Sequence, residues 1–150
     1  MIKKLDEKYL EKLNNFLNEI DNDFPIPLSE KVNLFEFSKK VLSLGIVLAE
    51  FDGDTICGAI LFYANDKETK TSYVSVLGVL KSHRKKGIAK RLLSECIKTL
   101  KEMDFKTVSL YTHKTNLNAI ALYEKNGFKK ETDLKRPDDW LLKYNLEEQK

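Results

Sequence analysis

The sequence has few residues of the kinds that bind metals or form disulfides. Its 150 residues include two cysteines, Cys57 and Cys96, and two histidines, His83 and His113. No CxxC, CxxH or HxxxH motif occurs, so the pattern gives no indication of a zinc site. Cys57 falls in a strand-like apolar run, and Cys96 falls on the apolar side of a helical pattern. We therefore expect two reduced thiols in the core and no bound metal.

Long hydrophobic runs and a strong excess of one charge are also missing. No apolar stretch reaches the length that crosses a bilayer, and the stretch from Met1 to Asp6 lacks the apolar core of a secretory signal. The 26 basic and 23 acidic residues leave a formal net charge of +3. This charge is too small for a surface built throughout to hold DNA or RNA. We expect a cytoplasmic protein without a membrane or nucleic-acid partner, in which any anion site is local.

Glycine and proline are scarce, at six and three residues, and no linker rich in them divides the chain. A chain of this length is the usual size of one domain, so we expect residues 1–150 to form a single domain. Hydrophobic periodicity and turn residues predict its helices and strands. The expected helices are 6–20, a second that is capped by Ser29 and ended by Gly45, 88–103 and 118–125.

The expected strands are 46–51, 55–64, 71–80, 107–112, one after Gly127 and one near 140–146. Strands in a run, followed by strands that alternate with helices, predict an α/β (α+β layered) fold with a mixed sheet. In the second helix, the side chains expected on the buried side are those of Val32, Leu34, Phe35 and Val41.

The stretch HRKKGIAKRLL, residues 83–93, gathers five basic side chains around Gly87, where a helical apolar pattern begins. They are Arg84, Lys85, Lys86, Lys90 and Arg91. A helix N-terminus offers unpaired N–H groups and a partial positive charge, which together stabilise a phosphate. A solvated helix face or a nucleic-acid patch is also compatible with this stretch. Neither GxxxxGK[ST] nor GxGxxG occurs, which argues against a P-loop nucleoside triphosphatase and a Rossmann dehydrogenase.

Two longer motifs resemble one known family. The stretch VSVLGVLKSHRKKGIAKRLL, residues 74–93, resembles the acetyl-coenzyme A motif of the GNAT superfamily of N-acetyltransferases, in which a strand ending in L-x-V precedes R/Q-x-x-G-x-G/A. The matching residues are Leu77, Val79, Arg84, Gly87 and Ala89. The stretch NLNAIALYEKNGF, residues 116–128, resembles the family's second motif, N-x-x-A-x-x-L-Y-x-x-x-G-F. Here the matching residues are Asn116, Ala119, Leu122, Tyr123, Gly127 and Phe128.

The resemblance implies a fold, a co-substrate and a set of site residues. The fold would be a mixed, strongly twisted GNAT-like sheet of about six to seven strands flanked by about four helices. Strands 71–80 and 107–112 would splay apart and admit the pantetheine arm of acetyl-coenzyme A, the co-substrate. The implied cofactor-binding residues are Leu77, Gly78, Val79, Arg84, Lys85, Lys86, Gly87, Ile88, Ala89, Lys90, Asn116 and Tyr123. Tyr123 is also the implied catalytic residue, a general acid for the departing thiolate.

The general base stays unassigned at this point. Several members of the family place a glutamate where this sequence has Ser75 or Tyr111. A water held by Tyr73, Ser75 and Tyr111 is one candidate for the proton relay. His113 is another, because it shares strand parity with Tyr111 and has a suitable intrinsic pKa.

The acceptor implied by the resemblance is the amine of a small molecule or a peptide, and we expect it to enter near the segment Phe24–Pro27 and the loop after Gly127. Asp21, Asp23 and Glu30 would suit a cationic amine there, although solvated helix ends explain these acids as well. We expect a monomer or a homodimer. Two other functions stay open: a coenzyme A-binding regulatory module with weak or no turnover, and a nucleic-acid binder, for which no aromatic stacking platform accompanies the basic stretch.

Overall fold

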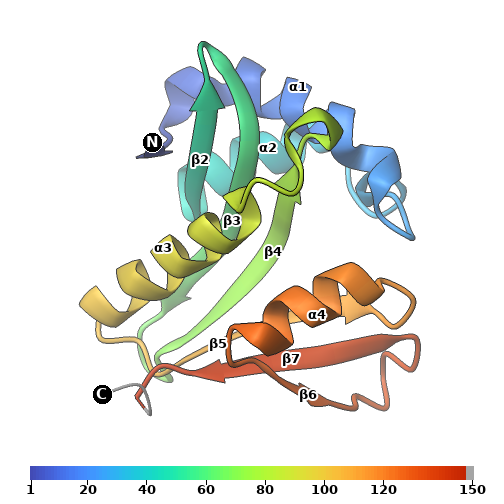
Figure 1. The fold of residues 1–150 in the computed structure, drawn as a ribbon. Helices are drawn as coiled ribbons and strands as arrows, with labels where there is room; N and C mark the ends of the chain where they lie inside the picture. The colour runs from blue at the N-terminus through green and yellow to red at the C-terminus, as the bar shows by residue number, and fades with distance from the viewer. Residues whose placement is uncertain (148–150) are drawn as a thin grey trace.

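The computed structural model describes residues 1–147, which form one sheet of seven strands. The strands are β1 (Ile2–Lys4), β2 (Ile46–Asp52), β3 (Thr55–Asp66), β4 (Thr71–Val79), β5 (Thr107–His113), β6 (Lys129–Glu131) and β7 (Asp139–Asn145). They lie in the order β1-β2-β3-β4-β5-β7-β6 (Figure 1). Only the β4–β5 pair is parallel among these strands. The mixed sheet predicted from the sequence is confirmed.

Helices cover both faces of the sheet. They are α1 (Leu10–Ile20), α2 (Leu34–Leu44), α3 (Ile88–Glu102) and α4 (Leu117–Lys125). The helix α3 packs across β2, β3 and β4, while α1 and α2 pack together on the opposite face (Figure 1). Residues of β2 alternate between the two layers as strand geometry requires: Leu48 joins the core under α3, whereas Val47 and Ala49 join the core under α1 and α2.

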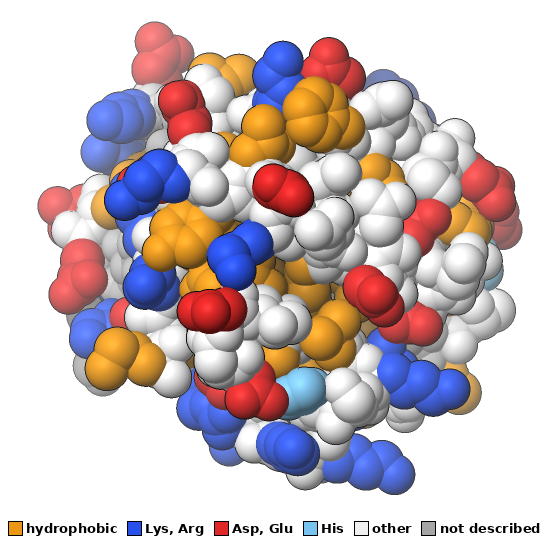
Figure 2. All heavy atoms as spheres, turned by 90° about the horizontal axis from the view of Figure 1, so that it is seen from above, with side chains coloured by type: hydrophobic (Ala, Val, Ile, Leu, Met, Phe, Trp, Pro, Cys, Tyr) orange, Lys and Arg blue, Asp and Glu red, His pale blue; other side chains and the backbone are white. Residues whose placement is uncertain are grey.

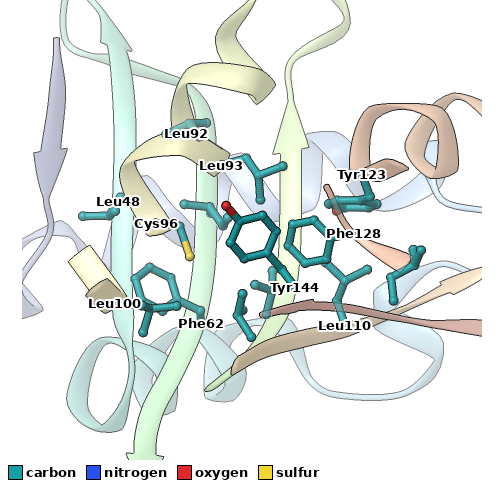
Figure 3. Close-up of a cluster of buried hydrophobic side chains, with 14 of the residues drawn as sticks. Leu48, Phe62, Leu92, Leu93, Cys96, Leu100, Leu110, Tyr123, Phe128 and Tyr144 are labelled. Carbon is teal, nitrogen blue, oxygen red and sulfur yellow. The ribbon is translucent and has the colours of Figure 1, made fainter. Parts of the chain in front are cut away.

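The core under α3 continues to the far end of the sheet. In Figure 3 the α3 side chains Leu92, Leu93, Cys96 and Leu100 project toward the strands and lie around Phe62 and Tyr144. Both cysteines are buried and unpaired in the described chain, as the sequence predicted.

The N-terminal region differs from the sequence-based expectation in two ways. The strand β1 was not expected, because it has only three residues, of which Ile2 alone is apolar. The expected cap of α2 is wrong: the cap is Asn33, whose side chain accepts a hydrogen bond from a helical amide (2.9 Å). Ser29 instead donates its amide to the carboxylate of Asp21 (2.8 Å). Two side chains expected to be buried are exposed: Val32 lies before α2 begins, and Phe35 lies on the outer side of the helix.

The parallel strands β4 and β5 separate soon after they begin. They pair only where Thr71–Tyr73 lie beside Thr107–Ser109. Beyond this point β4 follows β3 to Val79 and β5 follows β7 to His113, and the two strands diverge (Figure 1). Ser75 is an extra residue in β4 opposite β3, and such a bulge bends its strand. Beyond Tyr73, the edge of β4 that faces β5 has no strand partner within residues 1–147.

Candidate functional site

The turn between β4 and α3, residues 84–87, is called the glycine turn below. It contains two residues with left-handed backbone, Lys85 (φ 65°) and Gly87 (φ 79°). The first backbone hydrogen bond of α3 runs from the Arg91 amide to the Gly87 carbonyl (3.0 Å). The amides of Gly87, Ile88, Ala89 and Lys90 therefore have no acceptor within the helix. This cluster of free N–H groups at the positive end of a 15-residue helix suits an anion.

The basic side chains around Gly87 divide into two groups. Lys85, Lys86 and Lys90 are exposed and surround the free amides with positive charge. Arg84 is already bound: its Nη2 donates to Asp23 Oδ2 (2.6 Å) and its Nε to the carbonyl oxygen of Val79 (3.2 Å). Arg91 is also bound, to Glu50 on β2. The side chain of Ile88 belongs to the core, so only its backbone is available to a ligand.

Two pockets meet where β4 and β5 separate. The first, called the helix pocket, lies between the end of β4 and α4. Its lining residues are Ile20, Asp23, Phe24, Leu77, Gly78, Val79, Arg84, Ala89, Asn116, Asn118, Ala119, Leu122 and Tyr123. Most of the expected cofactor-binding residues are among them. Lys85, Lys86, Gly87, Ile88 and Lys90 are not, although they adjoin this pocket through the glycine turn.

The second, called the strand pocket, lies between β4 and β5. It is lined by Phe24, Pro25, Ile26, Leu28, Lys31, Val74, Ser75, Val76, Leu77, Leu110, Tyr111, Thr112, His113, Asn116, Ala119, Tyr123, Arg136 and Asp139. Both pockets share Phe24, Leu77, Asn116, Ala119 and Tyr123. The two adjacent pockets are together called the passage below, and their common wall includes Tyr123.

Tyr123 is buried on α4, with an exposed fraction of 6%. Its ring packs edge-on against Phe128 (5.5 Å between centroids), and its hydroxyl has no hydrogen-bond partner in residues 1–147. Burial raises the pKa of Tyr123 above the usual range, because a phenolate there would lose its hydration. The phenol is therefore protonated at neutral pH and free to donate to a group in the passage.

Asn116, expected beside the cofactor arm, has a clear structural role. It caps α4, where its side chain accepts from the amide of Ala119 (3.4 Å). It also lines both pockets, so capping places it at the passage. Gly78 lies under the end of α1, where an added Cβ would come within 2.4 Å of Ile20 Cδ1. Only glycine lets α1 approach β4 this closely at that position.

At the far end of the strand pocket, the connection between β6 and β7 supplies residues that the sequence reading missed. The guanidinium of Arg136 lies 3.7 Å above the ring centre of Tyr111 and binds Asp139 through Nη2 (2.9 Å). The Tyr111 hydroxyl donates to Asp133 Oδ2 (2.6 Å). No motif of the sequence includes these residues. The antiparallel β5–β7 pairing, which sets His113 opposite Asp139, brings the connection to the pocket.

The structure brings together part of the expected proton relay. Ser75, Tyr111 and His113 line the strand pocket, whereas Tyr73 lies beside it, with its ring centre 6.3 Å from that of Tyr111. The Asp133 carboxylate, which accepts the Tyr111 hydrogen bond, raises the pKa of Tyr111, so this phenol is not a base at neutral pH. His113 Nδ1 pairs with Thr115 Oγ1 (2.7 Å), which fixes the ring at the pocket.

The acids expected near the acceptor do not line the strand pocket. Asp21 accepts from Ser29 and Asp23 from Arg84, so both carboxylates are already engaged. The carboxylate that does line it is Asp139, beside the cations Lys31 and Arg136.

The surface charge is mixed. On the face shown in Figure 2, basic and acidic side chains are interspersed, and hydrophobic side chains lie at the bottom of a hollow. Residues 1–147 contain no cluster of histidine, cysteine and acidic residues that would hold a metal ion. Across the same residues, no helix has both the length and the apolar character that crossing a membrane requires.

Comparison with known proteins agrees with this geometry. Residues 10–128 match the acetyltransferase (GNAT) family. The N-terminal acetyltransferase complex ARD1 subunit homolog of Dictyostelium discoideum is 36% identical over 77 residues, covering 51% of this chain and 38% of that protein. The N-alpha-acetyltransferase MAK3 of Arabidopsis thaliana is 31% identical over 103 residues, covering 67% of this chain and 54% of that protein. The chain thus spans about half or less of the length of these two relatives.

Solved structures share the fold over almost the whole chain. The PaiA N-acetyltransferase of Thermoplasma acidophilum, in complex with coenzyme A, has a TM-score of 0.78 at 24% identity, covering 97% of this chain and 98% of that one. The ribosomal-protein-S18-alanine N-acetyltransferase of Escherichia coli has a TM-score of 0.77 at 18% identity, covering 97% of this chain and 93% of that one. With a family match over most of its length and this sheet, the chain belongs to the GNAT acetyltransferase family.

Proposed function

We propose that this chain is an N-acetyltransferase that moves the acetyl group of acetyl-coenzyme A to a primary amine. The observation that carries the proposal is the passage in which the two pockets share Tyr123. A protonated phenol at the junction of two pockets suits a reaction in which one substrate enters from each side. The named relatives and the coenzyme A in the PaiA structure support the same reaction.

The residues present fit coenzyme A at the helix pocket. The free amides of Gly87 to Lys90, with three exposed lysines nearby, suit a diphosphate. The unpaired edge of β4 at Leu77–Val79 offers main-chain groups to the amides of a pantetheine arm. Asn116 and Ala119 on the opposite side would flank that arm.

In the proposed mechanism the chain positions the amine and manages two protons. When bound, acetyl-coenzyme A supplies a thioester whose carbonyl carbon bonds to the amine nitrogen as the carbon–sulfur bond breaks. Tyr123 holds the proton that the sulfur receives. A main-chain N–H of β4 near Leu77–Val79 would stabilise the carbonyl oxygen as its charge develops. The amine loses its proton to a water in the strand pocket or to His113, and this proton balances the one that Tyr123 gives up.

For the acceptor we favour the α-amine of a peptide over a small amine. The two relatives described above are named as an N-terminal acetyltransferase complex subunit homolog and an N-alpha-acetyltransferase. The strand pocket is lined by apolar side chains of the segment Phe24–Leu28 and by the polar pair Arg136–Asp139, which can hold both the side chain and the backbone of a peptide. A cytoplasmic location and a monomeric or homodimeric state stay predictions.

The test is steady-state acetylation of a panel of peptides, amino acids, polyamines and amino sugars by the wild-type protein and by Tyr123→Phe. We expect peptides to be preferred, and Tyr123→Phe to lower kcat by about 100-fold, the usual scale of a lost general acid. Tyr144→Phe is the matched control, because Tyr144 is also a buried tyrosine but lines neither pocket. Coenzyme A binding without turnover of any amine would instead favour a regulatory module.

A further inference from the structure

One carboxylate is buried behind the glycine turn. Glu50, on β2, has an exposed fraction of 9% and is the only charged residue among the buried ones in residues 1–147. A buried carboxylate needs a partner, because burial removes its hydration. That partner is Arg91, one of the five basic residues around Gly87 and one that the proposed function does not use.

Arg91 makes three directed hydrogen bonds. Its Nε donates to Glu50 Oε1 (3.1 Å) and its Nη2 to Glu50 Oε2 (2.7 Å), the parallel two-bond geometry of an arginine–carboxylate pair. Its Nη1 donates to the carbonyl oxygen of Lys86 (2.9 Å). Because the guanidinium is planar and rigid, fixing two of its nitrogens on Glu50 also fixes the direction of the third.

The Lys86 carbonyl and the Gly87 N–H belong to the same peptide unit. In a trans peptide these two groups point in opposite directions, and no peptide bond in the described chain is cis. When Arg91 holds the Lys86 carbonyl on its own side, the Gly87 N–H must point away from Arg91. Of the two residues that this peptide joins, Gly87 has left-handed backbone, and so does Lys85, the residue before Lys86. A flip of the Lys86–Gly87 peptide would turn the Lys86 carbonyl toward the place where an anion would bind.

A second carboxylate of β2, that of Asp52, binds the segment just before the glycine turn. His83 Nε2 donates to Asp52 Oδ2 (2.8 Å), just before the glycine turn. The strand β2 thus anchors both sides of the turn, Asp52 through His83 and Glu50 through Arg91. Both contacts are made between residues of this chain.

We propose that Arg91, held by Glu50, is a positioning residue for the diphosphate site, which it serves by orienting the Lys86–Gly87 peptide. This inference rests on the proposed function, since it assumes that the glycine turn holds the diphosphate of coenzyme A. The alternative is that Arg91 contributes only its positive charge to the site. Positioning and charge alone predict opposite effects on coenzyme A affinity when Glu50 is replaced.

The decisive variant is Glu50→Gln. It removes a negative charge near an anion site, so a charge effect alone would leave the affinity for coenzyme A equal or higher. The positioning role predicts a lower affinity, because the guanidinium loses its carboxylate anchor. Arg91→Lys keeps the positive charge but loses the planar fork, and we expect it to weaken binding about tenfold, the scale of one lost charge-assisted hydrogen bond.

Calorimetric titration of coenzyme A measures these affinities, with thermal unfolding as the check that each variant is folded. Pantetheine, which lacks the diphosphate, is titrated in parallel and followed by amide NMR. Its affinity should be the same in the wild-type protein and both variants. Glu95→Gln is the matched control for Glu50→Gln, because it removes the same charge, and Lys98→Arg is the control for Arg91→Lys, because it also exchanges one cation for the other. Both side chains lie on α3 and have no hydrogen bond or ion pair in residues 1–147.

The possible outcomes separate the inference from the proposed function. Weaker coenzyme A binding in Glu50→Gln and Arg91→Lys, with pantetheine unchanged, supports positioning. Wild-type affinity in either variant overturns it and leaves the proposed function intact. An equal loss for coenzyme A and pantetheine also overturns it, because that pattern reports general loosening of the fold. A folded wild-type protein that binds no coenzyme A would contradict the proposed function, and the inference with it.

Discussion

Gly87 illustrates how a single residue serves both the fold and the proposed site. Its backbone has a φ of 79°, where a side chain costs about 1 kcal/mol or more. An added Cβ would also lie 3.3 Å from Nη1 of Arg91, the nitrogen that holds the Lys86 carbonyl. Steric strain and the site geometry therefore both favour glycine at this position.

We expect Gly87→Ala to lower the free energy of unfolding by about 1 kcal/mol and to weaken coenzyme A binding. Gly53→Ala is the matched control: Gly53 has a φ of 62° in the β2–β3 turn, and nothing lies within 4 Å of an added Cβ. Gly53→Ala should lower the free energy of unfolding by a similar amount without any change in the affinity for coenzyme A. Urea unfolding and calorimetry measure the two effects. Equal coenzyme A affinities in the two variants would argue against a role for this position in binding.

Glu50 should make stability depend on pH in the acid range. The hydrogen bonds from Arg91 hold the pKa of Glu50 below its ordinary value of 4.5. A carboxyl group whose pKa is lowered by folding stabilises the folded state above the unfolded pKa, and this contribution is lost as the pH falls through the folded pKa. In Glu50→Gln, the loss of stability between about pH 5 and pH 3 should be smaller than in the wild-type protein. Urea unfolding at several pH values tests this, and parallel pH profiles would contradict it.

Local sequence motifs predicted some of the site residues but could not predict others. Tyr123 and Gly87 each stand within a short motif whose spacing places them, so the sequence indicated both. Glu50, Arg136 and Asp139 reach the site only through packing or pairing with residues far along the chain. Nothing in their immediate sequence distinguishes them from ordinary surface charges.

Among the elements, the end of α1 packs closely against the strand β4 at the site. Gly78 lies beneath Ile20, and both residues line the helix pocket. The position of α1 is therefore set by the absence of a side chain on β4. The neighbouring Asp23, which binds Arg84, depends on the same placement of the chain.

We expect Gly78→Ala to destabilise the protein by about 1–3 kcal/mol, the usual effect of overpacking a core. Ile20→Val removes the Cδ1 atom that the new Cβ would meet and should alone cost about 1 kcal/mol. The double variant should be more stable than the sum of the two changes predicts. Chemical unfolding of the three variants measures this coupling. Strict additivity would show that the two side chains do not meet.

The elements themselves were predicted with uneven success, for physical reasons. The bounds of α3 were predicted almost to the residue, because its apolar stripe and the glycine before it indicate the same first residue. The start of α2 was wrong because Ser29, a good cap by composition, binds Asp21 across the preceding turn. The strand β1 forms only by pairing with β2, since its three residues have no pattern of their own.

For the whole molecule, the important feature is the separation of β4 from β5. It divides the sheet into a larger part, β1 to β4, and a smaller part formed by β5, β7 and β6 (Figure 1). The motifs of the sequence lie on both sides of this opening, the glycine turn after β4 and Tyr123 on α4 after β5. The resemblance to a family predicted the splayed pair, whereas periodicity alone predicted only a mixed sheet.

We propose that the opening between β4 and β5 and the glycine turn together hold acetyl-coenzyme A. The most direct measurement is calorimetric titration of acetyl-coenzyme A into the wild-type protein and into Gly87→Glu, with Gly53→Glu as the control of equal strain and charge. We expect micromolar binding with one site per chain in the wild-type protein and in Gly53→Glu, and no binding in a folded Gly87→Glu. Absence of binding by the folded wild-type protein, or equal binding by Gly87→Glu, would contradict this proposal.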